Sequence, residues 1–397
     1  MLSMNKNRNV LNISEEFLPF YTGHGIYTVK LQRFLQKLGY QFTIVTKRLK
    51  PELPASEVVQ GVPVERIEVY DAANFKQFYF KTIGFMIRRR REYRVLHINS
   101  YHDRYLLLLV VAKLLRKKVV VQMALYGTDD PQTFLRTYSL SRLRFAFIRR
   151  LIDCFFPIST PIEKSCLEAG VPASKITKIH QGVDLQRFAP AADDAAKQAL
   201  RRKLGLPENQ PLAIFVGAII ERKGVSELLE AWTKIQASVP DATLLLVGPY
   251  DFGDENVNVT SLNGFVEGLR ATIAQRNLRV IWAGRTDVVE QYMAAADMFV
   301  FPSRREGLPN VIIEAMSCEL PCVTTSMFGA ADDMVVPGET GYIVGGVDEL
   351  AERTTELLRD PAKVRAMGSR GREVALRKFD FENIASQYVK LYDSLQE

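Results

Sequence analysis

The chain has 397 residues, which is too many for one ordinary hydrophobic core, so two domains are expected. With 47% hydrophobic and 24% charged residues and no short-period repeat, the composition excludes a disordered, fibrous or repeat protein. The formal net charge of +7 comes from 52 Lys and Arg against 45 Asp and Glu, and no low-complexity charged tract accompanies it.

The sequence shows no signal for a membrane span, export or a metal. Its longest uninterrupted apolar stretch, Tyr105–Ala112, is far shorter than a membrane-spanning helix, and its first residues lack the apolar core of a signal peptide. Zinc-type spacing and nearby His partners are missing around its four cysteines, Cys154, Cys166, Cys318 and Cys322. We therefore expect a cytoplasmic protein with free, mostly buried thiols and no metal or other cofactor.

The first half of the chain alternates strand and helix patterns. Short apolar runs predict strands at Val10–Ile13, Phe42–Thr46, Val95–Ile98, Val119–Met123 and Cys154–Ile158. Between them, helices are predicted at Tyr27–Leu38, Arg104–Leu115 and Ile162–Ala169. Strands that alternate with helices are typical of a parallel sheet with helical crossovers.

The second half repeats this organisation. Strands are predicted at Leu212–Val216, Thr243–Val247, Val280–Trp282, Met298–Phe301 and Pro321–Thr324, and helices at Val225–Ile235, Val288–Ala295 and Val347–Leu358. The polar, Ala-rich segment Pro190–Pro211 reads as a linker with one short helix. The expected fold class is α/β, with two doubly wound Rossmann-like domains and a ligand cleft between them.

The domain boundaries follow from this pattern. We place the first domain at residues 1–188, the linker at 189–210 and the second domain at 211–379. The amphipathic C-terminal helix, over 380–397, is expected to pack back on the first domain.

Charge is divided unevenly between the halves. Residues 1–200 hold 31 Lys and Arg against 17 Asp and Glu, a net +14, whereas the remaining residues hold 21 against 28, a net −7. Basic residues gather at Arg88–Arg91, at Arg116–Lys118 and in Leu135–Ile152, where arginines and aromatics alternate at roughly helical spacing. Solvated helix faces and attraction to anionic lipid headgroups both explain this pattern. Nucleic acid is not an expected partner, because no binding motif accompanies the charge.

Two carboxylates frame the start of a predicted helix near the end of the chain. Glu306 follows a buried strand, Pro309 suits the first turn of a helix that runs to about Cys318, and Glu314 lies along that helix. Free backbone N–H groups at such a start form a cradle for an anion such as phosphate; here they belong to Gly307, Leu308, Asn310 and Val311. Together with Arg222-Lys223-Gly224 upstream, this pattern indicates an enzyme that binds a sugar nucleotide.

The chain resembles the family-4 retaining glycosyltransferases of GT-B architecture (glycosyl transferases group 1) nearly end to end. The resemblance is firmest in VGAIIERKGVSELLEAW (Val216–Trp232) and FPSRREGLPNVIIEAMSCELPCV (Phe301–Val323), with support from Gly170–Pro190 and Gly338–Val344. It implies a metal-independent enzyme that moves a sugar from a nucleotide-sugar donor to an acceptor with retention of configuration.

The resemblance also implies roles for the second-domain residues. Arg222 and Lys223 would clamp the donor phosphates as charge develops on the leaving nucleotide, with Gly217 and Gly224 flanking them. Glu306 would contact the donor sugar or its phosphate side, and Glu314 would accept from the ribose hydroxyls. The alternative is that these residues bind no ligand. Arg222, Lys223 and Glu306 would then be charged residues at helix starts, and Glu314 a partly buried, salt-bridged glutamate.

In the first domain, YTGHGIY (Tyr21–Tyr27) resembles the family's glycine-rich loop, in which Gly23 and Gly25 would let the backbone approach the diphosphate. A tight strand-to-helix turn without a ligand is the alternative. Many relatives carry a His near the end of the strand represented here by Val119–Asp130, and this chain has none there. His24 or Asp129, or the neighbouring Asp130, are candidate sugar or acceptor contacts instead.

The sequence therefore predicts a glycosyltransferase of polysaccharide or glycolipid biosynthesis, with a lipid-linked or saccharide acceptor and possible peripheral association with an anionic membrane. A soluble acceptor and a non-catalytic sugar-nucleotide-binding relative stay open. Two positions bear on the second alternative, because relatives often carry Arg at Ala218 and Gly at Glu319. The donor base, the sugar and the linkage are not encoded in any of these residues.

Overall fold

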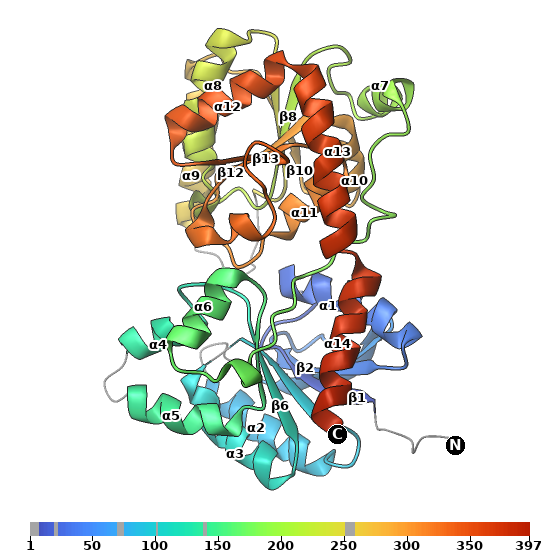
Figure 1. Ribbon diagram of the computed structural model, residues 1–397, viewed down its shortest axis with the longest axis vertical. Helices are drawn as coiled ribbons and strands as arrows, with labels where there is room; N and C mark the ends of the chain where they lie inside the picture. The colour runs from blue at the N-terminus through green and yellow to red at the C-terminus, as the bar shows by residue number, and fades with distance from the viewer. Residues whose placement is uncertain (1–7, 20–22, 70–74, 101, 138–140, 251–258) are drawn as a thin grey trace. The chain divides into compact units, whose positions relative to one another are not determined.

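The computed structural model describes residues 8–19, 23–69, 75–100, 102–137, 141–250 and 259–397. The chain divides into two compact units, one formed by residues 1–181 together with 381–397 and the other by residues 182–380 (Figure 1). Each unit is built on its own largely parallel sheet flanked by helices, which confirms the predicted class of two Rossmann-like domains.

The sheet of the first unit has seven strands in the order β3-β4-β2-β1-β5-β6-β7. All neighbours are parallel except β3 and β4, which pair antiparallel. The strands are β1 (Asn9–Ile13), β2 (Gln41–Arg48), β3 (Ser56–Val59), β4 (Val62–Glu68), β5 (Val95–Asn99), β6 (Lys118–Met123) and β7 (Cys154–Pro157). The five predicted strands are confirmed, and the β3–β4 pair is missing from the prediction because charged residues and Pro63 dilute its apolar pattern.

Helices cover both faces of this sheet. They are α1 (Gly23–Lys37), α2 (Phe75–Arg88), η1 (Asp103–Tyr105), α3 (Leu106–Leu114), α4 (Pro131–Thr137), α5 (Ser141–Leu151), α6 (Thr160–Glu168), η2 (Ala173–Lys175) and α14 (Phe381–Gln396). Phe155 of β7 packs against Phe145 of α5, whereas the next residue, Phe156, packs against Tyr388 of α14. Because successive strand residues point to opposite faces, α5 and α14 cover opposite faces of the sheet.

The C-terminal helix α14 belongs to the first unit. It packs against α1, and its Tyr388 and Tyr392 are buried in the same core as Val10, Phe42 and Phe156. A buried polar pair fixes it further, because the hydroxyl of Tyr392 lies 2.7 Å from Nδ1 of His97, whose Nε2 lies 3.1 Å from Gln122 Oε1. A helix distant in sequence thus completes the first hydrophobic core.

The sheet of the second unit has six parallel strands in the order β10-β9-β8-β11-β12-β13. The strands are β8 (Leu212–Val216), β9 (Thr243–Val247), β10 (Val280–Gly284), β11 (Met298–Phe301), β12 (Cys322–Thr325) and β13 (Gly341–Val344). The five predicted strands of this half are confirmed. The central four are almost wholly apolar and buried, as expected of strands covered by helices on both faces.

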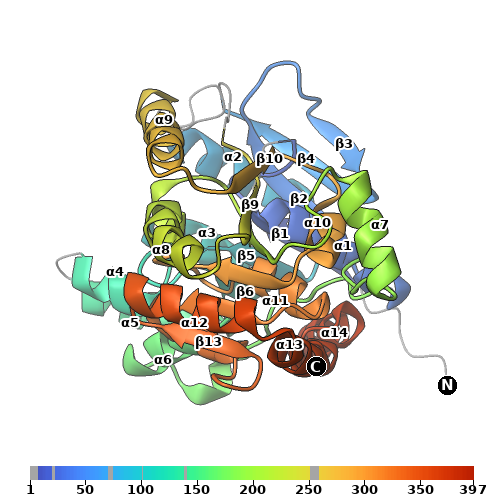
Figure 2. The same ribbon diagram turned by 90° about the horizontal axis from the view of Figure 1, so that it is seen from above.

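Helices α8 (Val225–Ser238), α9 (Val259–Gln275), α10 (Val289–Ala295), α11 (Asn310–Ser317), α12 (Val347–Arg359) and α13 (Pro361–Lys378) flank this sheet, with the short turns η3 (Glu221–Lys223), η4 (Met327–Gly329) and η5 (Ala331–Asp333). Figure 2 shows α12 beside α8, with which it is in contact. Helices α8, α10 and α12 match the prediction, whereas α9 and α13 are missing from it.

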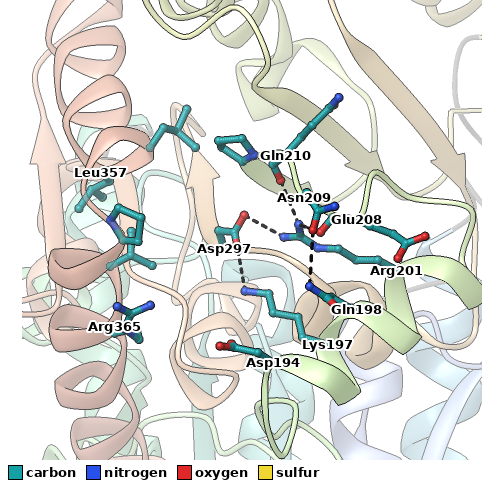
Figure 3. A pocket seen from close by; sticks show the side chains of 14 residues that line it. Asp194, Lys197, Gln198, Arg201, Glu208, Asn209, Gln210, Asp297, Leu357 and Arg365 are labelled. Atoms are coloured by element: carbon teal, nitrogen blue, oxygen red, sulfur yellow. Dashed lines mark hydrogen bonds and ion pairs between the residues drawn. The ribbon is translucent and has the colours of Figure 1, made fainter.

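The segment 189–210 is built into the second unit and does not hang between the units. It contains α7 (Asp194–Lys203), the single short helix predicted there. Asp297 fixes this helix by accepting from Lys197 Nζ at 2.6 Å and from Arg201 Nη2 at 2.8 Å (Figure 3). The boundary between the compact units accordingly falls after Gln181 and not at residue 188.

Candidate functional site

The residues singled out in the second half meet where the strand order of its sheet reverses. From β8 the chain proceeds outward to β9 and β10, and it then returns to place β11 on the other side of β8. Two loops leave the carboxyl ends of β8 and β11 at this point, one carrying Arg222 and Lys223 and the other carrying Glu306. Open α/β sheets bind their ligands at such a switch point.

The loop after β8 depends on a glycine. Gly224 ends η3 and begins α8 with φ +73°, a left-handed conformation that side chains rarely adopt. A Cβ added at Gly224 would lie 2.0 Å from the carbonyl oxygen of Pro302, so only glycine fits between the two loops. A hydrogen bond also joins the two loops, because the Arg304 N–H donates to the Arg222 carbonyl at 3.0 Å. Arg-Lys-Gly is therefore a close-packed loop junction.

Three donors converge on one oxygen of Glu306. Its Oε1 accepts from Arg222 Nη1 at 2.8 Å, from Lys223 Nζ at 2.7 Å and from the Ser303 hydroxyl at 2.6 Å. Arg222 Nη1 also donates to the carbonyl of Arg305 at 2.5 Å. The cluster joins the two loops and, with two cations and one carboxylate, carries a net charge of +1.

Burial strengthens the electrostatics of this cluster. The side chains of Lys223 and Glu306 are only 14% and 12% exposed, and the Lys223 ammonium lies 5.0 Å from the centre of the Phe301 ring. Burial lowers the pKa of Lys223 below its ordinary value of 10.5, the charge and hydrogen bond of Glu306 oppose this, and Arg222 adds to the lowering. An anionic ligand would supply the cluster with the negative charge that it lacks.

The helix α11 begins beside this cluster. Pro309 is predicted within the first helical turn, but it has extended backbone (φ −75°, ψ 102°) and precedes the helix, which starts at Asn310. In the part of the chain that the structure describes, the N–H groups of Gly307, Leu308, Asn310 and Val311 have no acceptor. The side-chain Oδ1 of Asn310 is buried and likewise lacks a donor. This helix start therefore has the open backbone N–H groups that the sequence predicts, and the Asn310 side chain adds an acceptor that it does not.

Glu314 lies in the middle of α11 and is half-buried. Burial raises the pKa of the Cys318 thiol one turn further along the helix, and the negative charge of Glu314 adds to this rise. Gly217, at the end of β8, lies where backbones approach closely, because a Cβ on Gly248 would meet the Gly217 carbonyl oxygen at 2.0 Å. All the second-unit candidates thus lie on the loops or the helix at the carboxyl edge of the sheet.

The first-unit candidates are placed differently. Gly23 and Gly25 lie in the first turn of α1, after the carboxyl end of β1, while Tyr21, Thr22 and the side chain of His24 lie outside the described residues. Asp129 is 3% exposed, and its two oxygens accept from the backbone N–H groups of Ala124 (2.9 Å) and Leu125 (2.8 Å). A sugar could reach Asp129 only if this buried carboxyl became exposed.

Comparison with known protein families agrees with this geometry. Residues 196–374 match the family model "Glycosyl transferases group 1", and residues 21–187 match the model "Glycosyltransferase Family 4". The first model matches most of the second unit and the second model most of the first unit, and together they include every loop described above. The chain belongs to the group 1 glycosyltransferases.

Individual relatives of this glycosyltransferase align with between about half and nearly all of its length. It is 25% identical to an N-acetyl-alpha-D-glucosaminyl L-malate synthase of Bacillus anthracis, over 96% of each chain. It is 32% identical, over 54% of its own length and 55% of the relative's, to a GDP-mannose-dependent monoacylated alpha-(1-6)-phosphatidylinositol monomannoside mannosyltransferase of Corynebacterium glutamicum. Among solved structures, HepE of Anabaena in complex with UDP-glucose matches with a TM-score of 0.73 and 20% identity, over 97% of this chain and 99% of that one.

Ser303 is a further candidate site residue of the glycosyltransferase, and the sequence argument missed it. It lies two residues after β11 and is fully buried, and its hydroxyl donates to Glu306 while its carbonyl accepts from the Thr325 hydroxyl. The signal for it was a hydroxyl residue directly after the strand-ending Pro302, at the switch point. A second missed cluster lies in the first unit, where Glu15 accepts from Lys47, Arg104 and Tyr105 at the carboxyl ends of β1 and β5.

Other features of the glycosyltransferase bear on metals, membranes and cavities. Across the described ranges, no three His, Cys, Asp or Glu side chains lie close enough to hold a metal ion. Likewise, no helix placed by the structure combines the length and the apolar character needed to cross a bilayer. Figure 3 shows a cavity of about 360 Å³ beside α7. Its lining includes Pro211 and Asp297, which directly precede β8 and β11, so it lies at the sheet edge opposite the Glu306 cluster.

Proposed function

We propose that this glycosyltransferase takes its sugar from a nucleoside-diphosphate sugar whose diphosphate is held by Arg222 and Lys223. The observation that carries the proposal is the convergence of both cations on Glu306 at the strand-order switch point. The open N–H groups at the start of α11 and the unpaired Oδ1 of Asn310 support it, because they offer donors to phosphate and an acceptor to a sugar hydroxyl.

The cluster suits the charge that develops during transfer. When the bond between the sugar C1 and the phosphate oxygen breaks, negative charge grows on the departing diphosphate, and preorganised cations and N–H dipoles stabilise it most where water is excluded. Arg222 and Lys223 are held in place before the donor arrives, because Glu306, Ser303 and the Arg305 carbonyl fix them. We propose that these cations do the work that a metal ion does in other sugar-nucleotide enzymes.

Retention of configuration is part of the proposal. The acceptor hydroxyl would attack C1 on the face that the phosphate leaves, the new C1–O bond would form as the C1–phosphate bond breaks, and the hydroxyl proton would pass to the departing phosphate oxygen. The engagement of Glu306 supports this route over a covalent glycosyl-enzyme, because its Oε1 already accepts from three groups. Glu314 would bind the ribose hydroxyls.

The acceptor proposed is the saccharide or lipid-linked intermediate of a polysaccharide or glycolipid. The Corynebacterium relative is named for a phosphatidylinositol mannoside, and this supports a lipid-linked acceptor. The Bacillus anthracis relative is named for L-malate and aligns over 96% of this chain, so a small soluble acceptor is the second candidate.

The test is transfer from UDP-, GDP- and ADP-sugars in the presence of excess chelator, with the product configuration read by NMR. The proposal predicts turnover with one donor series, insensitivity to the chelator, and the donor's anomeric configuration in the product. Arg222→Ala should lower turnover by about a hundredfold or more. A product of inverted configuration would contradict the proposed retention. Activity that only a divalent ion restores would contradict the proposed role of Arg222 and Lys223 in place of a metal.

A further inference from the structure

We infer that helices α2, α3 and α5 of the first unit form a docking surface for an anionic phospholipid bilayer. The inference goes beyond the proposed function and does not depend on the donor, because the surface consists of outward side chains remote in sequence from the Glu306 cluster. It begins from the exposed apolar residues of these helices.

The outer face of α3 is apolar along its length. Leu107 and Leu114 are 44% and 77% exposed, and Val110 and Val111 between them are half-buried on the same side. A helix of a water-soluble protein normally turns charged or polar residues outward, and α3 carries only Lys113 as a charged residue, paired with Asp153. This face lacks the polar groups that water would solvate.

The helices on either side of α3 continue the apolar surface. Figure 1 shows α2, α3 and α5 together in the first unit, and contacts join α3 to both neighbours; Tyr79 of α2 accepts from the backbone N–H of Leu108. Phe80 and Ile87 of α2 are 59% and 43% exposed, and Leu143 and Phe147 of α5 are 72% and 48% exposed.

Exposed apolar side chains are concentrated on these three helices. Of the twelve large hydrophobic side chains exposed in the described residues, six lie on α2, α3 and α5. Scattered single apolar residues need no explanation, but a grouped set on adjacent helices marks an interaction surface.

The charge of the same helices identifies the partner. Their 34 residues include eight Lys and Arg and no Asp or Glu, whereas a merely solvated surface mixes both signs. Leu143, Phe147 and Arg150 follow one another at helical spacing on the exposed side of α5, so apolar and cationic groups share one face. Apolar side chains accompanied by cations suit an anionic lipid surface, where the aromatic and aliphatic groups enter the headgroup region.

A hollow beside α5 suits the phosphate of a lipid headgroup. It measures about 490 Å³, lies between α4, α5 and α6, and is lined by Arg136, Arg142, Arg149 and one carboxylate, Glu168. Figure 2 shows these three helices grouped together. Arg149 donates to the Gly170 carbonyl, while Arg136 and Arg142 form no ion pair with any described residue. Guanidinium groups in such a hollow are available to bind phosphate.

The experiment is flotation of the full chain with phosphatidylcholine vesicles, with and without about a third of phosphatidylglycerol, at low and high salt. The account predicts binding to the anionic vesicles alone, weakened by salt. Arg142→Gln with Arg150→Gln should lower the partition coefficient about tenfold or more, since each basic residue contributes a severalfold factor. Leu114→Ser with Leu143→Ser should weaken binding that persists at high salt.

Matched controls make the result specific. Arg33→Gln with Lys390→Gln removes the same charge from α1 and α14, on the opposite face of the sheet, and Val58→Ser removes an apolar group that is 67% exposed on β3. These variants should bind as the unmodified chain does. Absence of vesicle binding, equal loss in the controls, or preferential binding to duplex DNA would overturn the inference. Nucleotide binding is measured on the same samples, so that a failure to bind vesicles can be told apart from a failure of the proposed donor site.

Discussion

Lys223 donates from Nζ to Oε1 of Glu306 across 2.7 Å and so joins the loop after β8 to the loop after β11. Both side chains are largely buried, and Arg222 meets the same oxygen at 2.8 Å. A buried carboxylate therefore neutralises part of the cation cluster that we propose for the donor diphosphate. The site is assembled, but short of negative charge, before a donor arrives.

Replacing Glu306 by Gln tests whether its carboxylate offsets the positive charge of Lys223 and Arg222. Without the carboxylate, Lys223 and Arg222 repel each other in a buried site, so the free energy of unfolding of the unliganded chain should fall by about 3 kcal/mol. A bound nucleoside diphosphate restores the missing charge, so the stabilisation by UDP or its counterpart should exceed that of the unmodified chain. Denaturant unfolding with and without nucleotide measures both effects. Asp348→Asn, which breaks the exposed Lys234–Asp348 pair, is the control and should change little.

The lowered pKa of Lys223 predicts a pH dependence. In the window just below 10.5, the unfolded chain holds this proton and the folded chain has begun to lose it, so the stability contribution of Lys223 rises with pH there. Nucleotide affinity should run the opposite way, because the deprotonated amine no longer attracts phosphate. Affinity measured from about pH 7 to about pH 10 should fall earlier than an ordinary lysine allows. Lys223→Arg should remove the fall, and an unchanged profile would exclude Lys223 from the phosphate site.

Gly224→Ala should destabilise the second unit through two effects. The left-handed backbone costs a Cβ-bearing residue about 1–2 kcal/mol, and the new Cβ would also collide with the Pro302 carbonyl. Gly205→Ala is the matched control, because Gly205 has φ +67° and no other atom lies within 4 Å of the place that its Cβ would occupy. Chemical denaturation should show a larger loss for Gly224→Ala than for Gly205→Ala. Equal losses would mean that the two loops separate freely.

Glu319 occupies a position that favours glycine. Its φ is +59°, its side chain is 40% exposed, and its nearest cationic partner, Arg372, lies 4.0 Å away. Because the weak exposed pair contributes little, relief of the left-handed strain should dominate. Glu319→Gly is expected to raise the free energy of unfolding by about 0.5–1 kcal/mol and to leave transfer unchanged. A loss of activity in this variant would show that Glu319 has a role beyond its backbone.

The sequence predicted the strands of the switch point and the loops that follow them. Runs such as Leu212–Val216 and Met298–Phe301 are short, apolar and bounded by Gly or Pro, so their pattern allows one assignment. The helix α13 was missed because it is polar and basic over Pro361–Lys378 and shows no regular apolar stripe. The start of α11 was placed one residue early, because Pro309 takes the extended backbone that precedes a helix.

Side-chain partnerships were harder to predict than positions. Nothing in the spacing of Arg222, Lys223 and Glu306 shows that one oxygen receives both cations, or that Ser303 completes the set. Asp129 was one of three candidates for a polar group facing the sugar, and the pattern did not show that its oxygens accept from backbone N–H groups of the loop after β6. Such outcomes depend on the path of the backbone between strands, which apolar periodicity does not encode.

The most direct test of the donor site is thermal unfolding with a panel of UDP-, GDP- and ADP-sugars, on the unmodified chain and on Lys223→Ala, Glu314→Ala and Lys234→Ala. A donor present at about a hundred times its dissociation constant should add roughly 2.7 kcal/mol of stability. We predict that one nucleotide series stabilises the unmodified chain and the Lys234→Ala control, and that the response is lost or much reduced in Lys223→Ala and Glu314→Ala. Equal stabilisation of all four proteins would contradict the proposed donor site.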